Sequence, residues 1–255
     1  MSDFKKLYLK SQIELIKTSK IDSLTFFRFH NAKKNNQENN IFKNIISGDY
    51  HLFKKFPEDS LATFFYQKAL TSSIEIKDTL LISETYKKIL FQLSQNRGAS
   101  DVSLNYLNSY KKYLYDLHEK SIYLFYVSTA KAIVENKEKI EDLKKGLLLV
   151  NRTSNRFLKA KYNQMIGVYY SHFKKENDSA LFYMQKAKEL LEVKNYQLFK
   201  NELFGVYGNI GQYIEKKGDL FLANTYYEKA TKIKVPKYRY LVKVKLNEIL
   251  SNNAL

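Results

Sequence analysis

The sequence predicts an all-α fold of about six antiparallel helix pairs plus a terminal helix, and three observations lead to that prediction. The 255 residues include only 2 Pro and 8 Gly, too few for the frequent turns of an all-β protein. No alternating apolar and polar run is long enough to predict a strand. A pattern of small, large and small residues also recurs along the chain at helical spacing.

The recurring pattern predicts helices that pack closely on a neighbour. In one copy, Ala223 is followed four residues later by Tyr227 and three residues after that by Ala230. This spacing keeps all three side chains on one helical face, where the small residues admit a neighbouring helix and the aromatic ring fills the gap. Strong copies occupy 59–70, 178–187 and 220–230, and a fainter copy occupies 22–32.

The copies also set a repeat length. Their last small positions lie 37, 41, 37, 40 and 43 residues apart, a mean of about 40. Tyr110 and Leu147 take that position in degenerate third and fourth copies. The six marker positions are Ala32, Ala69, Tyr110, Leu147, Ala187 and Ala230.

Each copy predicts the second helix of a pair, and a further helix is expected before it. The last pair is the clearest, because Gly218 and Asp219 supply a tight turn in which the Gly ends one helix and the Asp caps the next. Ser60 and Ser179 are expected as N-caps of the helices that follow them. The stretch 35–40 is the most loop-like. In chain order the expected helices cover 3–18, 21–34, 38–55, 58–72, 76–96, 100–115, 118–135, 137–151, 155–174, 177–192, 196–216, 219–233 and 237–250, in one domain spanning 1–255.

These residues resemble the tetratricopeptide repeat. The sixth pair matches that family's pattern almost position for position, the fifth matches it with one inserted residue, and the second matches it on the second helix only. The similarity is best over 57–235. The matching residues are Tyr207, Ile210, Gly211, Ile214, Gly218, Asp219, Ala223, Tyr227 and Ala230, then Gly167, Tyr170, Ala180, Met184 and Ala187, then Ala62, Tyr66 and Ala69.

The resemblance implies a right-handed superhelix whose concave groove, lined by the first helix of each pair, binds a peptide or protein. The period near 40 is similar to the lengthened repeats of bacterial sensor and regulator proteins, which implies a regulatory region of a signalling or transcription-regulating protein. Amides suit a peptide main chain and Lys suits a carboxylate, although the two-carboxylate clamp of the family is not reproduced. The expected groove residues are Lys87, Lys88, Phe91 and Gln95, then Tyr126 and Thr129, then Lys161, Gln164, Met165, Ser171 and His172, then Gly208, Asn209 and Gln212.

Charge supports an alternative. The formal net charge is +17, which favours anionic partners. Nucleic-acid binding, an assembly scaffold or membrane-surface contact through the basic C-terminal region therefore stays open, although no nucleic-acid-binding motif occurs and most aromatic residues fall at core spacing. A homodimer is left open as well. The densest basic cluster is Lys229, Lys232, Lys234, Lys237, Arg239, Lys243 and Lys245.

No pattern predicts an enzyme, a cofactor or a metal site. The chain has no Cys, and its four His are scattered without metal-ligand spacing. Gly205, Gly208 and Gly211 have the wrong spacing for a nucleotide loop and predict close helix packing instead. No apolar run approaches the roughly 20 residues that span a bilayer. The sequence reads as cytoplasmic, or as periplasmic if it is an excised sensor domain.

Overall fold

The computed structural model describes residues 3–31, 36–54, 57–94, 100–134, 140–193 and 195–233. Within these residues the chain forms twelve α-helices and no strand, which confirms the predicted all-α class. The observed helices agree with the expected ranges to within a few residues. The expected terminal helix at 237–250 lies outside the described residues.

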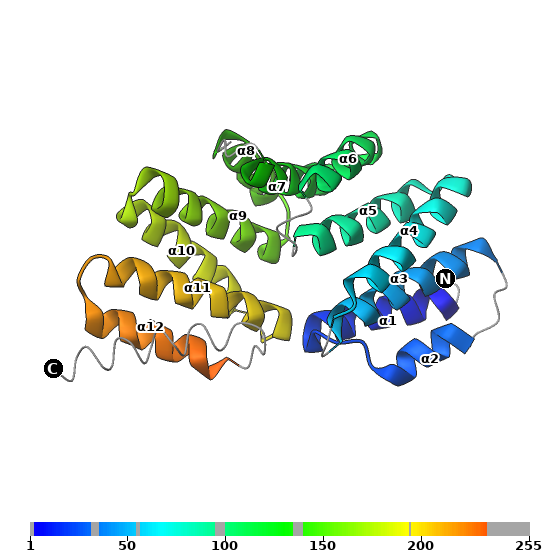
Figure 1. Ribbon diagram of the computed structural model, residues 1–255, viewed down its shortest axis with the longest axis horizontal. Helices are drawn as coiled ribbons and strands as arrows, with labels where there is room; N and C mark the ends of the chain where they lie inside the picture. The colour runs from blue at the N-terminus through cyan, green and yellow to red at the C-terminus, as the bar shows by residue number, and fades with distance from the viewer. Residues whose placement is uncertain are drawn as a thin grey trace. The chain divides into compact units, whose positions relative to one another are not determined.

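The chain divides into two compact units, Met1–Lys139 and Ile140–Leu255 (Figure 1). The division falls between α7 (Leu117–Val134) and α8 (Ile140–Asn151), the two members of the expected fourth pair. The single repeat domain and the handedness of the superhelix stay predictions. The first unit contains α1 (Asp3–Thr18), α2 (Ser23–Asn31), α3 (Gln37–Phe53), α4 (Asp59–Glu75), α5 (Thr79–Ser94), α6 (Ser100–Tyr110), a short 3-10 helix (Lys111–Tyr113) and α7 (Leu117–Val134).

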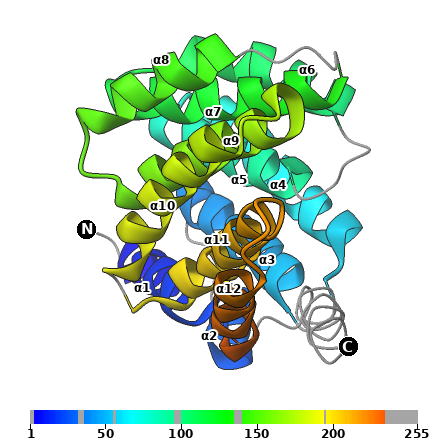
Figure 2. The ribbon, with the colours of Figure 1, turned by 90° about the vertical axis from the view of Figure 1, so that its left-hand side faces the viewer.

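The second unit contains five successive helices, each of which packs against the next (Figures 1 and 2). The helices are α8 (Ile140–Asn151), α9 (Arg156–Tyr169), which continues as a π-helix (Tyr170–Lys174), α10 (Asn177–Glu192), α11 (Gln197–Glu215) and α12 (Leu220–Lys232).

A glycine on the first helix of a pair faces a large side chain on the second helix in three pairs. A Cβ at Gly48 would lie 2.4 Å from the Tyr66 ring, and one at Gly211 would lie 2.8 Å from the Tyr227 ring. A Cβ at Gly167 would lie 3.2 Å from the Met184 side chain. Only the absence of a side chain lets these helices approach so closely. Gly48 is thus the small residue that the second pair seemed to lack in the sequence.

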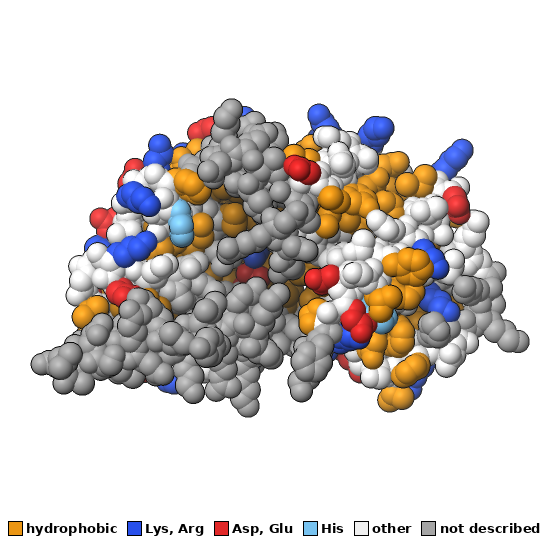
Figure 3. All heavy atoms as spheres, in the orientation of Figure 1, with side chains coloured by type: hydrophobic (Ala, Val, Ile, Leu, Met, Phe, Trp, Pro, Cys, Tyr) orange, Lys and Arg blue, Asp and Glu red, His pale blue; other side chains and the backbone are white. Residues whose placement is uncertain are grey.

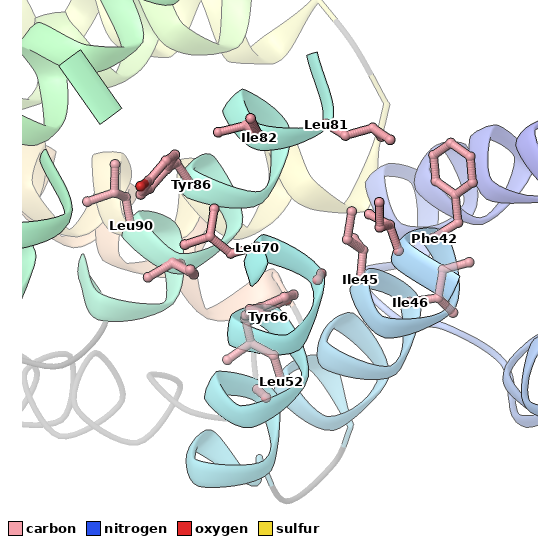
Figure 4. Packing of buried hydrophobic residues seen from close by; sticks show 14 of the residues in the cluster. Phe42, Ile45, Ile46, Leu52, Tyr66, Leu70, Leu81, Ile82, Tyr86 and Leu90 are labelled. Atoms are coloured by element: carbon pink, nitrogen blue, oxygen red, sulfur yellow. The ribbon is translucent and has the colours of Figure 1, made fainter. Parts of the chain in front are cut away.

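In unit 1, Tyr66, the residue that faces Gly48, belongs to a core shared by α3, α4 and α5. Tyr66 is fully buried, and Figure 4 shows it on α4 within a cluster of buried apolar side chains from α3, α4 and α5. Both α1 and α2 pack against α3, so the first expected pair joins the core through its neighbour.

The inserted residue of the fifth pair has a structural explanation. Gly211 precedes Ala223 by 12 residues, whereas Gly167 precedes Ala180 by 13. The π-helix at Tyr170–Lys174 lies between Gly167 and Ala180. A π-turn accommodates one extra residue in a helix. The glycine therefore faces a large side chain of the second helix in both pairs, Met184 for Gly167 and Tyr227 for Gly211.

The turn residues were predicted with mixed success. Gly218 has φ +89°, and the Asp219 side chain accepts a hydrogen bond from the backbone N–H of Leu222 at 2.9 Å, as expected. The Ser60 and Ser179 caps were wrong, because α4 and α10 begin earlier, after Glu58 and Glu176.

The marker expected for the fourth copy, Leu147, lies one residue after the small residue that is buried in the structure. In α8 the buried residues are Leu143, Gly146 and Val150, whereas Leu147 is only partly buried. The Tyr162 ring occupies the space beside Gly146, so the glycine is the small residue of this repeat.

Candidate functional site

Two expected groove cations of unit 1, Lys87 and Lys88, lie in a network of ion pairs. The Lys88 ammonium lies 2.9 Å from the Asp49 carboxylate, which is fully buried between α3 and its neighbours. Asp49 also accepts hydrogen bonds from Tyr66 at 2.7 Å and from the Gln12 amide at 2.8 Å. Gln12 in turn accepts one from Lys88 at 2.6 Å. A buried carboxylate is thus fully compensated by a cation and two neutral donors.

Lys87, the preceding residue on α5, pairs with two other carboxylates. Its ammonium lies 2.8 Å from Glu119 on α7 and 3.1 Å from Glu84 on its own helix. Glu119 is 1% exposed and also accepts hydrogen bonds from the Ser83 and Tyr110 hydroxyls. The two lysines therefore hold helices of unit 1 together, and neither presents a free ammonium group.

The network shifts the titration of its members. Burial acts to raise the pKa of Glu119, but attraction by Lys87 and hydrogen bonds from Lys87, Ser83 and Tyr110 outweigh it, so this pKa lies below its usual value. Burial acts to lower the pKa of Lys87, yet Glu84 and Glu119 raise it overall. Burial also acts to raise the pKa of Glu84, but attraction by Lys87 and Lys88 lowers it overall. Lys87, Glu84 and Glu119 are therefore all ionised at neutral pH.

Acid should weaken unit 1 through Glu119. Its folded pKa is below the unfolded value of about 4.3, so its contribution to stability is complete above that pH and is lost as pH falls through the folded pKa. We expect the free energy of unfolding to fall less steeply below pH 4 in Glu119→Gln than in the parent, measured by urea denaturation. Asp178→Asn, which removes a pair with Lys217 in which Asp178 is 86% exposed, is the control. Equal slopes for the parent and Glu119→Gln would contradict this assignment.

The expected aromatic groove residues of unit 1 are partly buried. Phe91 stacks on Phe53 of α3 with ring centroids 5.8 Å apart. Burial raises the pKa of the Tyr126 hydroxyl, and the Thr129 hydroxyl donates to the Phe125 carbonyl at 2.8 Å. Gln95 lies outside the described residues. These side chains contribute to packing in unit 1, and their role in a groove stays a prediction.

Unit 2 brings four of the expected residues onto one face. Lys161 on α9 lies 2.8 Å from Glu202 on α11, and one turn later the Gln164 amide lies over Gly205, 3.4 Å from where a Cβ would stand. At the far end, the Lys216 ammonium is 3.5 Å from the Ser171 hydroxyl. These contacts show that α9 and α11 run side by side in the same direction. Asn209 and Gln212 continue the stripe that begins at Glu202, at helical spacing.

We call this surface the α9–α11 face, formed by Lys161, Gln164, Glu202, Asn209 and Gln212. Its charged pair is internally neutralised. The amides of Gln164, Asn209 and Gln212 make no side-chain hydrogen bond within the described residues, and the first two are partly buried whereas Gln212 is exposed. The face can therefore offer both donors and acceptors to a ligand.

Other expected residues of unit 2 lie at the edge of this face or apart from it. Met165 is partly buried, and Gly208 lies on α11 without a side chain to offer. His172 is exposed in the π-helix, where its Nδ1 lies 3.1 Å from the Val168 carbonyl oxygen. No group of three or more His, Cys, Asp or Glu residues able to hold a metal ion occurs in the described part of the chain.

The basic cluster is only partly described. Lys229 and Lys232 are exposed on α12, and the Lys229 ammonium lies 5.2 Å from the centroid of the Tyr226 ring. The remaining members, Lys234, Lys237, Arg239, Lys243 and Lys245, lie outside the described residues. No described helix is both long enough and apolar enough to cross a membrane.

Sequence reasoning missed a groove between α3 and α4. The Asn-rich stretch looked like a loop, but Asn36 caps α3 by accepting a hydrogen bond from the Asn39 N–H at 2.8 Å. The helix therefore starts at Gln37 and carries Asn40 and Asn44 on the groove wall. Their four-residue spacing was the available signal.

No family model matches the chain, and no curated protein matches it.

Proposed function

We propose that this protein binds a peptide or protein partner through the α9–α11 face. The observation that carries the proposal is the set of three amides, Gln164, Asn209 and Gln212, that the fold aligns on two adjacent helices but leaves without side-chain partners. A Gln or Asn amide can donate to a main-chain carbonyl and accept from a main-chain N–H at once. A row of such groups suits an extended or helical peptide.

The charged residues of the α9–α11 face, Lys161 and Glu202, pair with each other. Because Lys161 is paired with Glu202 at 2.8 Å, the face does not select strongly for acidic ligands. Met165 offers an apolar contact at its edge. Affinity is expected to come from several main-chain hydrogen bonds and one or two anchors.

A regulatory role is part of the proposal and rests on resemblance alone. The repeat period near 40 is similar to that of bacterial sensor and regulator proteins. In such a role, peptide occupancy of the face would alter the packing of α9 on α11 and pass that change to an output domain. Fold-level analogy gives this step its only support.

The test is a peptide-library screen with the parent and with the double variant Gln164→Ala plus Asn209→Ala. Each lost hydrogen bond is worth about 0.5–1.5 kcal/mol, so captured peptides should bind roughly tenfold or more weakly. Gln185→Ala, which removes an exposed amide of α10, is the matched control and should bind like the parent. Peptides retained undiminished by the double variant would show that this face is not the site.

A further inference from the structure

We propose that the groove between α3 and α4 in unit 1 binds an extended, acidic segment of a partner protein. This site is in a different unit from the α9–α11 face and does not depend on it. The groove encloses about 490 Å³ and is lined on α3 by Asn40 and Asn44 and on α4 by Phe64, Lys68 and Ser72, among others. Its volume is within the range of sites that hold small ligands.

Asn44 is a largely buried residue whose amide opens onto the groove without a partner among the described residues. It is only 8% exposed, it lines the groove, and its side chain makes no hydrogen bond to any described residue. The equivalent residue in unit 2 is Asn163, since each lies four positions before the glycine that faces the second helix. Asn163 is 5% exposed, but its amide donates to the Lys159 carbonyl at 2.8 Å. The fold can therefore satisfy an amide at this position, and it leaves the one in the groove open to a ligand.

The charge of the groove selects an acidic ligand. The Lys68 ammonium lies 4.3 Å from the centroid of the Phe64 ring and has no carboxylate partner within the described residues. None of the described residues that line the groove is an Asp or a Glu. Figure 3 shows Lys side chains next to hydrophobic ones over this part of unit 1. A carboxylate on the ligand would give Lys68 the ion pair that it lacks.

The spacing of the two amides suits an extended chain. Asn40 and Asn44 are four residues apart on α3, which separates them by about 6 Å along the helix axis. In an extended peptide, main-chain groups that point to the same side recur every two residues, a distance of roughly 6.6–6.8 Å. The two amides can therefore bond the main chain at alternate residues while Lys68, on the opposite wall, receives an acidic side chain.

The experiment measures fluorescence anisotropy of a labelled octapeptide of alternating Ser and Glu, titrated with the full chain in low salt. We expect Lys68→Ala to weaken binding at least tenfold and Asn44→Ala about fivefold. The peptide with Gln in place of Glu should also bind at least tenfold more weakly. Lys186→Ala is the matched control, because the Lys186 ammonium lies 4.2 Å from the Phe182 ring centroid on α10. It removes the same charge and ring contact, and should change binding less than twofold.

Several results would overturn the proposal: no binding by the parent, equal binding of the Glu and Gln peptides, or equal losses in Lys68→Ala and Lys186→Ala. If Asn44→Ala fails to fold, Asn40→Ala at the partly buried neighbouring position replaces it and should also weaken binding. The double variant Gln164→Ala plus Asn209→Ala should bind the acidic peptide normally. A loss there would assign the peptide to the α9–α11 face, which would support the proposed function and reject this groove.

Discussion

Replacing Ala180 or Ala223 with Asp is expected to abolish cooperative folding of unit 2. Both side chains are fully buried where the second helix of a pair meets the first. A Cβ placed on Gly167 would stand only 3.1 Å from the Ala180 carbonyl oxygen, which shows how closely the two helices approach where Ala180 packs. An unpaired carboxylate buried there should cost about 4 kcal/mol or more, a large share of the total stability of a typical domain.

Thermal unfolding followed by circular dichroism, together with gel filtration, would measure the effect. Lys175→Asp is the control, because Lys175 is exposed and has φ 59°, a left-handed conformation that Asp tolerates better than most residues. The control should melt close to the parent. If both Ala variants also melt like the parent, the helix register deduced for unit 2 is wrong.

Replacing Asp49 with Ala should destabilise unit 1 by about 3–5 kcal/mol, the usual cost of leaving a buried charge without its partner. Asp49 is fully buried, and its loss would leave Lys88, whose side chain is 14% exposed, without a counter-ion. The Tyr66 hydroxyl would lose its acceptor as well. Urea denaturation monitored by circular dichroism would give the change in unfolding free energy.

Two further variants distinguish the cost of breaking a buried ion pair from the cost of removing any carboxylate. Glu202→Ala breaks the Lys161–Glu202 pair, which has a similar distance of 2.8 Å but side chains 25% and 22% exposed, and should cost only about 1 kcal/mol or less. Adding Lys88→Met to Asp49→Ala removes the orphaned cation and should recover part of the loss. Equal effects of Asp49→Ala and Glu202→Ala would contradict the importance of the buried network.

The sequence by itself determined the helices and much of their pairing. The spacing of Ala62, Tyr66 and Ala69 is a local pattern, and all three residues are fully buried on one face of α4. The Gly218–Asp219 turn is equally local, because a left-handed residue and a capping side chain act within a few positions of the chain. Such signals survive in a single sequence since they need no knowledge of distant residues.

Only the tertiary structure decided which polar residues are available for binding. Lys87 and Lys88 looked like groove cations, but each pairs with a buried carboxylate on another helix, 32 and 39 residues away in sequence. The local pattern shows the nearby Glu84 of Lys87 but does not reveal these distant partners. Conversely, nothing in the sequence singled out Asn44, yet packing places it beside a groove without a hydrogen-bond partner among the described residues. Helix formation depends on neighbours along the chain, whereas the pairing of a charge or an amide depends on which distant side chain the packing of helices brings within hydrogen-bond reach.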